Sequence, residues 1–418
     1  MNRTPRIRPV VGCTLLVVTL VAGVTACGGS GDHPLAEKPY DAVDQISANA
    51  SDGDQKVGPG QALEVRVKGD DSRITDVSAV DTTGRHLAGE LDADGKRWHS
   101  TLPLAAGTRY TVRVSTENHD GAPGSRTLAF GTTSAKKLLQ VAFGPEAGTY
   151  GVGQPITAEL SAPVKDRASR ANVERALRVH STPAVTGSWY WVDDKTLHYR
   201  PKDYWPARAT IDVTSGLAGV KVTEGLYGAA TKPLKLTTGA RIEALTDAES
   251  HTMTVKRDGK VINTIPVTTG KPGFSTRNGV KVVLGKEYYV RMRGETIGIA
   301  QGSSDSYDLP VYYATRVTWS GEYVHAAPWS TGSQGYANVS HGCTGMSTSQ
   351  AEWFYNTVRP GDLVTVTGSE GETMTPFDNG FGDWNLSWAA WLKGSALRKN
   401  TAPDRTDTIQ AARLRPEV

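Results

Sequence analysis

Two histidines and a cysteine stand close together in the C-terminal half of the sequence. His325 ends a strand-like run, and Ser-His-Gly-Cys follows at residues 340–343. The chain has three cysteines, and Cys343 is the only one beyond residue 27. A thiol beside an imidazole makes an activated nucleophile, because the imidazole can take the thiol proton. The pattern favours a thiol hydrolase or an acyltransferase with Cys343 as nucleophile and His325 as base.

The surroundings of Cys343 are expected to favour the thiolate, which is the reactive form of cysteine. A helix is predicted to begin a few residues later, so its positive end lies near the sulfur, and His325 can hold the proton as an imidazolium. Gly342 lets a substrate approach the backbone, where the N–H groups of Gly342 and Cys343 can receive an oxyanion. Glycine-flanked thiols of this kind suit acyl transfer.

Two other interpretations of these residues stay open at this point. A lone cysteine is most often a small buried hydrophobe, and a lone histidine is most often a structural group. His325, His341 and Cys343 are also three potential zinc ligands. Against zinc, the sequence has no second cysteine nearby and no His-Glu-x-x-His motif.

The elements that must position this site read as short strands and one helix. Asp-Gly at residues 258–259, between two alternating runs, predicts a hairpin with a type I′ turn. After Cys343 comes the one clear helix of this region, for which Ser347 and Ser349 are N-cap candidates. The predicted apolar face of this helix consists of Ala351, Phe354 and Val358.

Two further units precede this one, and both are predicted to be small β-sandwiches. Residues 54–136 alternate in short runs between turns, with Trp98 as an expected core anchor. Residues 137–239 repeat the theme, and their aromatic cluster at residues 189–205 is expected to pack inside the second sandwich. A ligand surface is the alternative for that cluster.

The region after residue 368 is predicted to be an extension that spans residues 369–418. Trp384, Trp388 and Trp391 are spaced by four and three residues, which places them on one side of a helix. They are expected to dock on the third unit, with a partner surface as the alternative. Residues 400–418 look disordered.

The first 26 residues have the three parts of an export signal. Arginines precede an apolar run at residues 10–24, which is shorter than the roughly 20 residues that span a bilayer. Small residues then lead to Cys27, as in the bacterial lipobox, where the cysteine is diacylated; ordinary cleavage is the alternative. Two or more acyl chains anchor a protein stably. Residues 27–53 are predicted to be a flexible tether.

The charge balance narrows the range of partners. The formal net charge is +3, with 46 Lys and Arg against 43 Asp and Glu, and three arginines of the leader account for the excess. The chain beyond the leader is formally neutral and has no basic run, which argues against nucleic acid as a partner. With one thiol left, no intrachain disulfide is expected, and the chain is long enough for about three packed cores.

Ser-His-Gly-Cys, with His325 eighteen residues before the thiol, resembles the L,D-transpeptidases of bacterial cell walls. Residues 267–273 and 276–279 match the start of that catalytic domain, and the whole chain is similar to the actinobacterial lipoprotein branch. The resemblance implies a mainly β fold. Two N-terminal immunoglobulin-like β-sandwiches would be followed, at residues 240–368, by a β-rich L,D-transpeptidase catalytic domain with a short helix after the catalytic cysteine.

The resemblance also implies a role for each site residue. Cys343 would be the acylated nucleophile, and His325 its base, held in one tautomer by the backbone carbonyl of Ala326. The implied oxyanion pocket consists of His341, Gly342 and Tyr307, the last on a lid-like segment at residues 302–309. The positions implied to line the substrate cleft are Met292, Ser320, Gly321, Trp329, Ser340 and Gly345.

One departure from the family pattern concerns the residues after the cysteine. Relatives often carry Asn or Arg two or three positions on, where this chain has Gly345 and Met346. Any side-chain contact to substrate from there is lost, so the preference for donor or acceptor is expected to differ.

The implied reaction is acyl transfer between peptidoglycan stem peptides. Cys343 attacks the carbonyl of the third residue, a diamino acid, in a donor tetrapeptide, and the terminal D-alanine leaves. A side-chain amine of a neighbouring stem then resolves the thioester into a 3→3 cross-link. No metal or cofactor is needed, and carbapenems are expected to acylate the same sulfur.

Two competing functions remain. In an L,D-carboxypeptidase, water would replace the amine acceptor, and the product would be a trimmed stem. A wall-binding lipoprotein with an inactive domain is the other, and the intact pair of His325 and Cys343 argues against it. In each case the lipid on Cys27 would fix the chain to the outer face of the cell membrane, facing the wall. The sequence does not give the oligomeric state.

Overall fold

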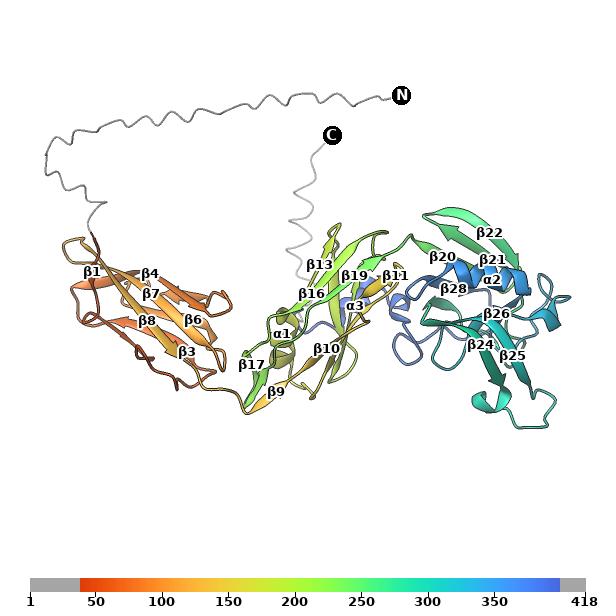
Figure 1. The fold of residues 1–418 in the computed structure, drawn as a ribbon, viewed down its shortest axis with the longest axis horizontal. Helices are drawn as coiled ribbons and strands as arrows, with labels where there is room; N and C mark the ends of the chain where they lie inside the picture. The colour runs from red at the N-terminus through yellow and green to blue at the C-terminus, as the bar shows by residue number, and fades with distance from the viewer. Residues whose placement is uncertain (1–37, 399–418) are drawn as a thin grey trace, which may run out of the picture.

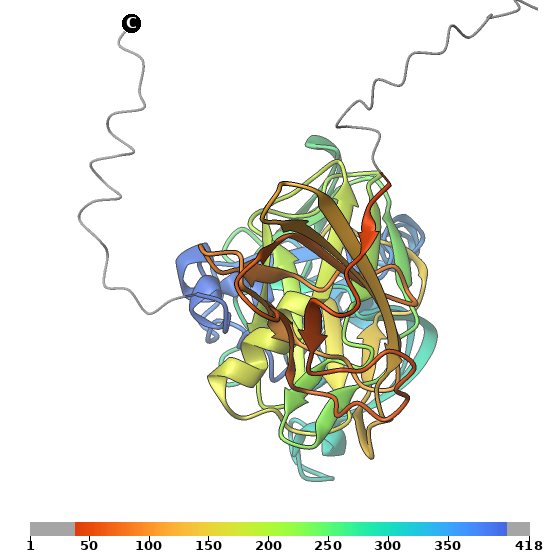
Figure 2. The same ribbon diagram turned by 90° about the vertical axis from the view of Figure 1, so that its left-hand side faces the viewer.

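The computed structural model describes residues 38–398 and arranges them as three β-rich units in a row (Figure 1). The first and second sandwiches come first, and the third unit lies at the far end; Figure 2 looks along the row from the first sandwich. The predicted mainly β fold is confirmed. The leader, Cys27 and residues 400–418 lie outside the described residues. No described helix is both long enough and apolar enough to cross a membrane.

The first sandwich consists of two four-stranded sheets. Its strands are β1 (Tyr40–Asp41), β2 (Ile46–Ala48), β3 (Ala62–Val67), β4 (Ser72–Asp81), β5 (Gly89–Leu91), β6 (Arg97–Pro103), β7 (Arg109–Asn118) and β8 (Pro123–Gly131). The sheet orders are β1-β8-β7-β4 and β2-β3-β6-β5. Along β7, Tyr110, Val112 and Val114 face the core, and the intervening residues are exposed, because successive side chains of a strand point to opposite faces. Trp98 is buried in the core, as predicted.

The tether predicted for residues 27–53 is wrong in its second half. Strands β1 and β2 lie inside that range, and Ala42 and Ile46 are fully buried in the first sandwich. These strands have two and three residues, which is too short for an alternating pattern to appear in the sequence. Their pairing with β8 and β3 holds them in place.

The second sandwich has three sheets and one helix that the sequence analysis missed. Its elements are β9 (Lys137–Leu139), β10 (Val141–Gly144), β11 (Gly148–Tyr150), β12 (Ile156–Leu160), α1 (Arg167–Ala176), β13 (Leu177–Thr182), β14 (Gly187–Trp191), β15 (Thr196–Pro201), β16 (Thr210–Ser215), β17 (Lys221–Thr223), β18 (Leu226–Gly228) and β19 (Leu234–Thr238). The sheet orders are β10-β12-β15-β14, β11-β19-β16-β13 and β17-β18-β9. Helix α1 begins at the N-cap Asp166, whose side chain accepts from the Ser169 N–H. The aromatic cluster packs inside, as predicted, with Trp189, Trp191 and Trp205 buried.

The third unit packs a five-stranded sheet and a four-stranded sheet around α2. Its elements are β20 (Ile242–Asp247), β21 (Thr252–Arg257), β22 (Lys260–Pro266), β23 (Gly279–Val282), β24 (Gly285–Arg293), η1 (Gly294–Ile297), β25 (Asp308–Arg316), β26 (Tyr323–Ala326), η2 (Pro328–Ser330), β27 (Thr344–Met346), α2 (Thr348–Thr357) and β28 (Leu363–Thr367). The sheet orders are β22-β21-β20-β28-β23 and β24-β25-β26-β27.

Local turn and cap chemistry of the third unit agrees with the sequence. Asp258 and Gly259 have φ angles of 50° and 80°, as a type I′ hairpin turn requires, and they join β21 to β22. Ser347 caps α2 and accepts from the Gln350 N–H. The predicted apolar face of α2 is buried, with Ala351, Phe354 and Val358 in the core.

Residues 369–398 form a C-terminal strap that lies against the second sandwich and the third unit. It contains η3 (Asp383–Asn385) and α3 (Trp388–Lys393), so the three tryptophans do not share one helix. They share a target instead, because their rings lie 4.8, 5.5 and 4.6 Å from the guanidinium carbon of Arg200 in β15. The expectation that they dock on the third unit is wrong. A buried cation on the second sandwich attracts them.

Candidate active site

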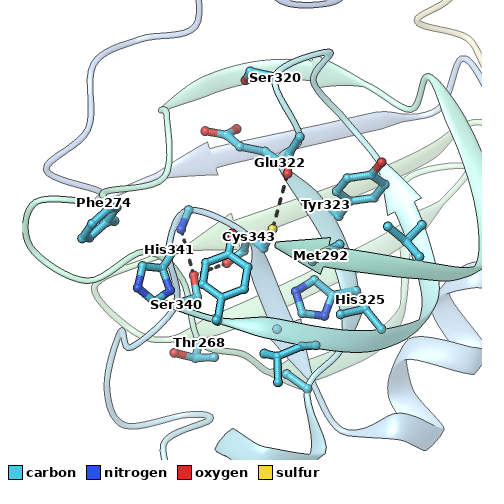
Figure 3. Close-up of a pocket in the computed structure, with 18 of the residues that line it drawn as sticks. Thr268, Phe274, Met292, Ser320, Glu322, Tyr323, His325, Ser340, His341 and Cys343 are labelled. Carbon is cyan, nitrogen blue, oxygen red and sulfur yellow. Dashed lines mark hydrogen bonds between the residues drawn. The ribbon is translucent and has the colours of Figure 1, made fainter. Parts of the chain in front are cut away.

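Strands β26 and β27 bring the predicted base and nucleophile to one place. The strands run parallel, with Val324 opposite Thr344 and His325 opposite Gly345. Cys343, the residue before β27, therefore stands beside Tyr323. Because alternate residues of a strand share a face, Cys343 and His325 lie on the same face of the pair. Figure 3 shows both side chains in one cleft.

The cleft has a volume of about 1070 Å³ and collects almost all the predicted site residues. Those at its wall are Met292, Tyr307, Ser320, Gly321, His325, Trp329, Ser340, His341, Gly342, Cys343 and Gly345. Ala326 is buried behind the wall and contributes its backbone carbonyl. Residues more than 50 positions apart in the sequence are thus within reach of one bound peptide.

The His325 ring is fixed in one tautomer. Its Nδ1 lies 2.8 Å from the backbone oxygen of Ala326, as the sequence analysis expected. A carbonyl oxygen only accepts hydrogen bonds, so Nδ1 must carry the proton and Nε2 keeps its lone pair. Burial lowers the pKa of His325, which keeps the imidazole neutral and ready to take a proton.

The Cys343 thiol differs from the expectation of a resting thiolate. Enclosure of the sulfur raises the pKa of Cys343 to about 11, although the Tyr323 N–H opposes this shift. The Sγ–H donates to the backbone oxygen of Gly321 at 3.6 Å. Both pKa shifts favour a neutral thiol beside a neutral imidazole in the resting site, against the predicted thiolate–imidazolium pair. Burial is the largest cause of the Cys343 pKa shift, and a sequence pattern does not report burial.

The turn before Cys343 is shaped by Ser340 and Gly342. Gly342 has a φ of 117°, a left-handed conformation that favours glycine, and an added Cβ would meet Phe274 O at 3.7 Å and Glu322 Cγ at 4.0 Å. Ser340 Oγ donates to the Cys343 carbonyl at 2.6 Å and accepts from the Gly342 N–H at 3.2 Å. Ser340 thus fixes the turn from both sides, in addition to lining the cleft.

Tyr307 reaches the cleft from the segment between η1 and β25. Its ring lies 4.9 Å from the His341 ring, and burial raises the pKa of Tyr307, so the phenol keeps its proton as a donor. The segment is tied down where Lys271 Nζ meets Asp305 Oδ1 at 2.5 Å. Burial lowers the pKa of His341 as well, which leaves that ring neutral.

The departure at positions 345 and 346 has a packing cause. A Cβ at position 345 would lie 2.9 Å from Ala327 Cβ and 3.2 Å from Thr268 Cγ2, so a larger residue would push these neighbours aside. Met346 is fully buried in the core of the third unit and faces away from any substrate. This chain therefore builds its cleft without a side chain at either position.

Sequence analysis missed three charged residues beside the cleft. Lys281 in β23 is 1% exposed, and its Nζ lies 2.5 Å from Glu322 Oε2. Arg277 Nη1 lies 2.9 Å from Glu322 Oε1. We call Lys281, Glu322 and Arg277 the buried ion cluster. The only sequence signal was a lysine between valines, which is typical of an exposed strand position as well.

The described residues 38–398 contain no group of three or more His, Cys, Asp or Glu side chains placed to hold a metal ion. His325 and Cys343 contact the Ala326 and Gly321 carbonyls, whereas His341 Nε2 lies 3.7 Å from Asp305 Oδ1 and has no hydrogen-bond partner among the described residues.

Two protein-family models match the chain. The bacterial Ig domain matches residues 54–221, and the L,D-transpeptidase catalytic domain matches residues 242–366. The chain is 33% identical to L,D-transpeptidase 2 of Mycobacterium tuberculosis, over 94% of this chain and 96% of that protein. It is 31% identical to L,D-transpeptidase 5 of Mycobacterium tuberculosis, over 95% of this chain and 88% of that protein. The solved structure of the LD transpeptidase LdtMt1 in complex with imipenem is 38% identical over 55% of this chain and all of that chain, with a TM-score of 0.47.

Proposed function

The chain belongs to the L,D-transpeptidases, which makes it a peptidoglycan cross-linking acyltransferase, and from that premise we propose how its own residues carry the reaction. Cys343 is the acylated nucleophile, and His325 is its base. The observation that carries this proposal is the His325 tautomer. With Nδ1 bound to Ala326, the neutral Nε2 is the basic atom on the face that carries the thiol.

The first half-reaction forms a thioester on Cys343. As the sulfur attacks the carbonyl of the third stem residue, His325 Nε2 takes the thiol proton, because both groups are neutral beforehand. The carbonyl oxygen becomes an oxyanion, and the Tyr307 hydroxyl and the turn at residues 341–343 stabilise it; one such donor is worth roughly 3 kcal/mol. The C–N bond to the terminal D-alanine breaks, and His325 returns the proton to the leaving amine.

The second half-reaction transfers the acyl group to a neighbouring stem. The side-chain amine of a diamino acid attacks the thioester, His325 takes the amine proton, and the proton returns to the sulfur as the 3→3 cross-link forms. Met292, Trp329 and the Ser320-Gly321 pair line the cleft and would hold the two peptides. No cofactor takes part in either step.

A carbapenem adduct tests the nucleophile. Cys343 should open the strained β-lactam and keep the acyl group as a thioester, which intact-protein mass spectrometry detects as one added molecule of drug. Cys343→Ala should show no adduct, whereas the thiol control Cys27→Ala should still form it. An adduct that survives Cys343→Ala would overturn the proposal. His325→Ala should slow adduct formation by about 10²–10⁴-fold, as expected for a lost base.

Product analysis separates cross-linking from trimming. Incubated with a tetrapeptide muropeptide, the enzyme should yield dimers joined from third residue to third residue. Tripeptide without dimer would favour the L,D-carboxypeptidase instead, because both reactions share the thioester and differ in the acceptor.

We also propose that Cys27 is diacylated and fixes the chain to the outer face of the cell membrane. The support is the lipobox-like sequence before Cys27 together with the family's action on the cell wall. Mass spectrometry of the N-terminal peptide should find the lipid, and Cys27→Ala should move the protein out of the membrane fraction. A membrane-bound Cys27→Ala variant would contradict this anchor.

A further inference from the structure

The buried ion cluster is placed against the nucleophile, and the reaction proposed above does not use it. Lys281 and Glu322 are almost fully buried, with side chains 1% and 8% exposed, while Arg277 is 43% exposed at the cleft wall. Charged side chains are seldom buried to this degree unless they are paired, because water would otherwise solvate them. Burying these charges beside the active-site thiol costs solvation energy, so we asked what the cluster does for the thiol.

Glu322 and Arg277 each follow a residue that contacts Cys343 or the turn before it. Glu322 follows Gly321, whose carbonyl accepts a hydrogen bond from the Cys343 thiol. Arg277 follows Thr276, whose Oγ1 donates to the Gly342 carbonyl at 2.8 Å. A Cβ on Gly342 would lie 4.0 Å from Glu322 Cγ, which is van der Waals contact, so the Glu322 side chain lies next to the turn.

Backbone contacts of Glu322 extend the cluster to the base. The Glu322 N–H donates to Thr318 Oγ1 at 2.8 Å, and its carbonyl accepts from the Val317 N–H at 3.0 Å. The next residue begins β26, which carries His325. The cluster therefore connects three parts of the site: strand β26, which carries His325, the loop at Gly321, which accepts a hydrogen bond from the thiol, and the turn before Cys343.

The charges of the cluster act on the sulfur in opposite directions. The Glu322 carboxylate raises the pKa of Cys343, and the Lys281 ammonium lowers it. Three neighbouring groups carry no charge at neutral pH, because burial lowers the pKa of His325 and of His341 and raises that of Tyr307. Burial also lowers the pKa of Lys281, and the ion pair with Glu322 opposes that shift.

We propose that the buried ion cluster positions Cys343 and tunes the reactivity of its thiol: the Glu322 carboxylate adds to the effect of burial in disfavouring the thiolate, and the Lys281 ammonium opposes Glu322. The proposal rests on Cys343 being the nucleophile. A protonated thiol reacts slowly with oxidants and with stray electrophiles, which matters for a lone thiol outside the cytoplasm. The thiol then becomes reactive when His325 takes its proton during attack on a bound peptide.

Two single substitutions that keep the shape of the side chain test the proposal, because they should change the alkylation rate of Cys343 in opposite directions. The full chain in detergent is treated with iodoacetamide at one mildly alkaline pH, and alkylation of the Cys343 peptide is followed by mass spectrometry. Glu322→Gln should speed alkylation and Lys281→Met should slow it, each by at least about threefold, because only the thiolate reacts. The double variant Lys281→Met/Glu322→Gln should return toward the unmodified rate. A cluster that serves only as packing would loosen the turn in both variants and shift both rates in the same direction, which would overturn the proposal.

Two further variants separate an effect of charge from a loss of folding. Glu322→Asp retains the charge and should stay within about twofold of the unmodified rate, since the electrostatic effect depends on the carboxylate. Should Lys281→Met fail to fold, Arg277→Gln removes a positive charge at the exposed end of the cluster and should also slow alkylation, to a smaller extent. Failure of the proposed nucleophile is a separate result: the carbapenem adduct on the unmodified chain would then be missing, whatever the alkylation rates.

Discussion

The two junctions between the three units are held together by different kinds of contact. At the first, the Arg85 guanidinium donates to the Gly216 carbonyl at 3.1 Å, and the Tyr227 hydroxyl donates to the Pro59 carbonyl at 3.2 Å. These are polar contacts, one from Arg85 and one from Tyr227 in β18. At the second, Val282 and Leu363 of the third unit belong to the same hydrophobic core as the second sandwich. The core of the first sandwich contains residues of that sandwich alone.

The strap strengthens the second junction. Trp391 is fully buried and its Nε1–H donates to the Ser188 carbonyl at 2.9 Å, while Trp384 Nε1–H donates to the Gly153 carbonyl at 2.8 Å. Asp383 is also fully buried and lies 2.8 Å from His198 Nδ1. Two units that share a core and a strap are expected to unfold together, whereas the first sandwich is expected to unfold by itself.

The strap also reaches the active-site loop, which gives the second junction a functional side. Asn379 Oδ1 accepts from the Ser320 N–H at 2.7 Å, and Asn379 Nδ2 donates to Ser320 Oγ at 2.8 Å. Ser320 precedes Gly321, whose carbonyl accepts a hydrogen bond from the Cys343 thiol. The second sandwich is thus linked through the strap to the cleft, and the first sandwich has no such link among the described residues.

The largest expected effect comes from Trp391→Ala. Loss of a fully buried tryptophan should cost about 3–5 kcal/mol of unfolding free energy, because the side chain leaves a cavity and the Arg200 guanidinium loses a ring. Urea unfolding of the full chain should show this loss in the transition of the second sandwich and third unit only. The reciprocal control, Trp98→Ala, should weaken only the first sandwich. Equal loss in both transitions for either variant would show that the junctions are alike.

Some features of the fold and the site could be predicted from the sequence, because they depend on residues that are close together along the chain. The Asp258-Gly259 turn and the Ser347 cap depend on neighbours a few positions away, and both predictions are confirmed. The contact of His325 with the Ala326 carbonyl follows from a motif, and it too is present. The family predicted from residues 340–343 is confirmed by relatives that match nearly the whole chain.

The remainder depends on contacts between distant residues, which a pattern along the chain does not encode. Arg200 meets Trp391 across almost two hundred residues, so the docking of the tryptophans was assigned to the wrong unit. Lys281 looks like a surface residue until Glu322 pairs with it. The state of the Cys343 thiol depends on enclosure by several segments, so the sequence suggested a thiolate where the fold favours a thiol.

A smaller effect, and one that depends on pH, is expected from Asp362→Asn at the second junction. Asp362 is fully buried, and Gly151 of the second sandwich packs so close that a Cβ there would lie 2.1 Å from its backbone nitrogen. Burial raises the pKa of Asp362 from 3.8 to about 7. The folded state therefore holds a proton that the unfolded state has lost, and stability must fall as the pH rises from about 4 to about 7.

Asparagine stays neutral, so Asp362→Asn should remove that fall. The variant should match the unmodified chain near pH 4 and exceed it by about 1–3 kcal/mol above pH 7. Urea unfolding across this pH range measures the difference, and the first sandwich should not change. A variant that is less stable at alkaline pH would show that the ionised carboxylate is needed at the junction.

The smallest effect is expected at the first junction, where Tyr227→Phe deletes the hydroxyl that donates to Pro59. A single hydrogen bond at a partly exposed site contributes about 0.5–1.5 kcal/mol, and water can replace the lost partner here, so the change should stay near the lower end. The link between the first two sandwiches should loosen all the same. Limited proteolysis should then cut the chain faster between residues 131 and 137, while the transition of the second sandwich and third unit and the rate of carbapenem adduct formation stay within error. A slower adduct would mean that the first sandwich, too, is coupled to the cleft, and the contrast between the two junctions would no longer hold.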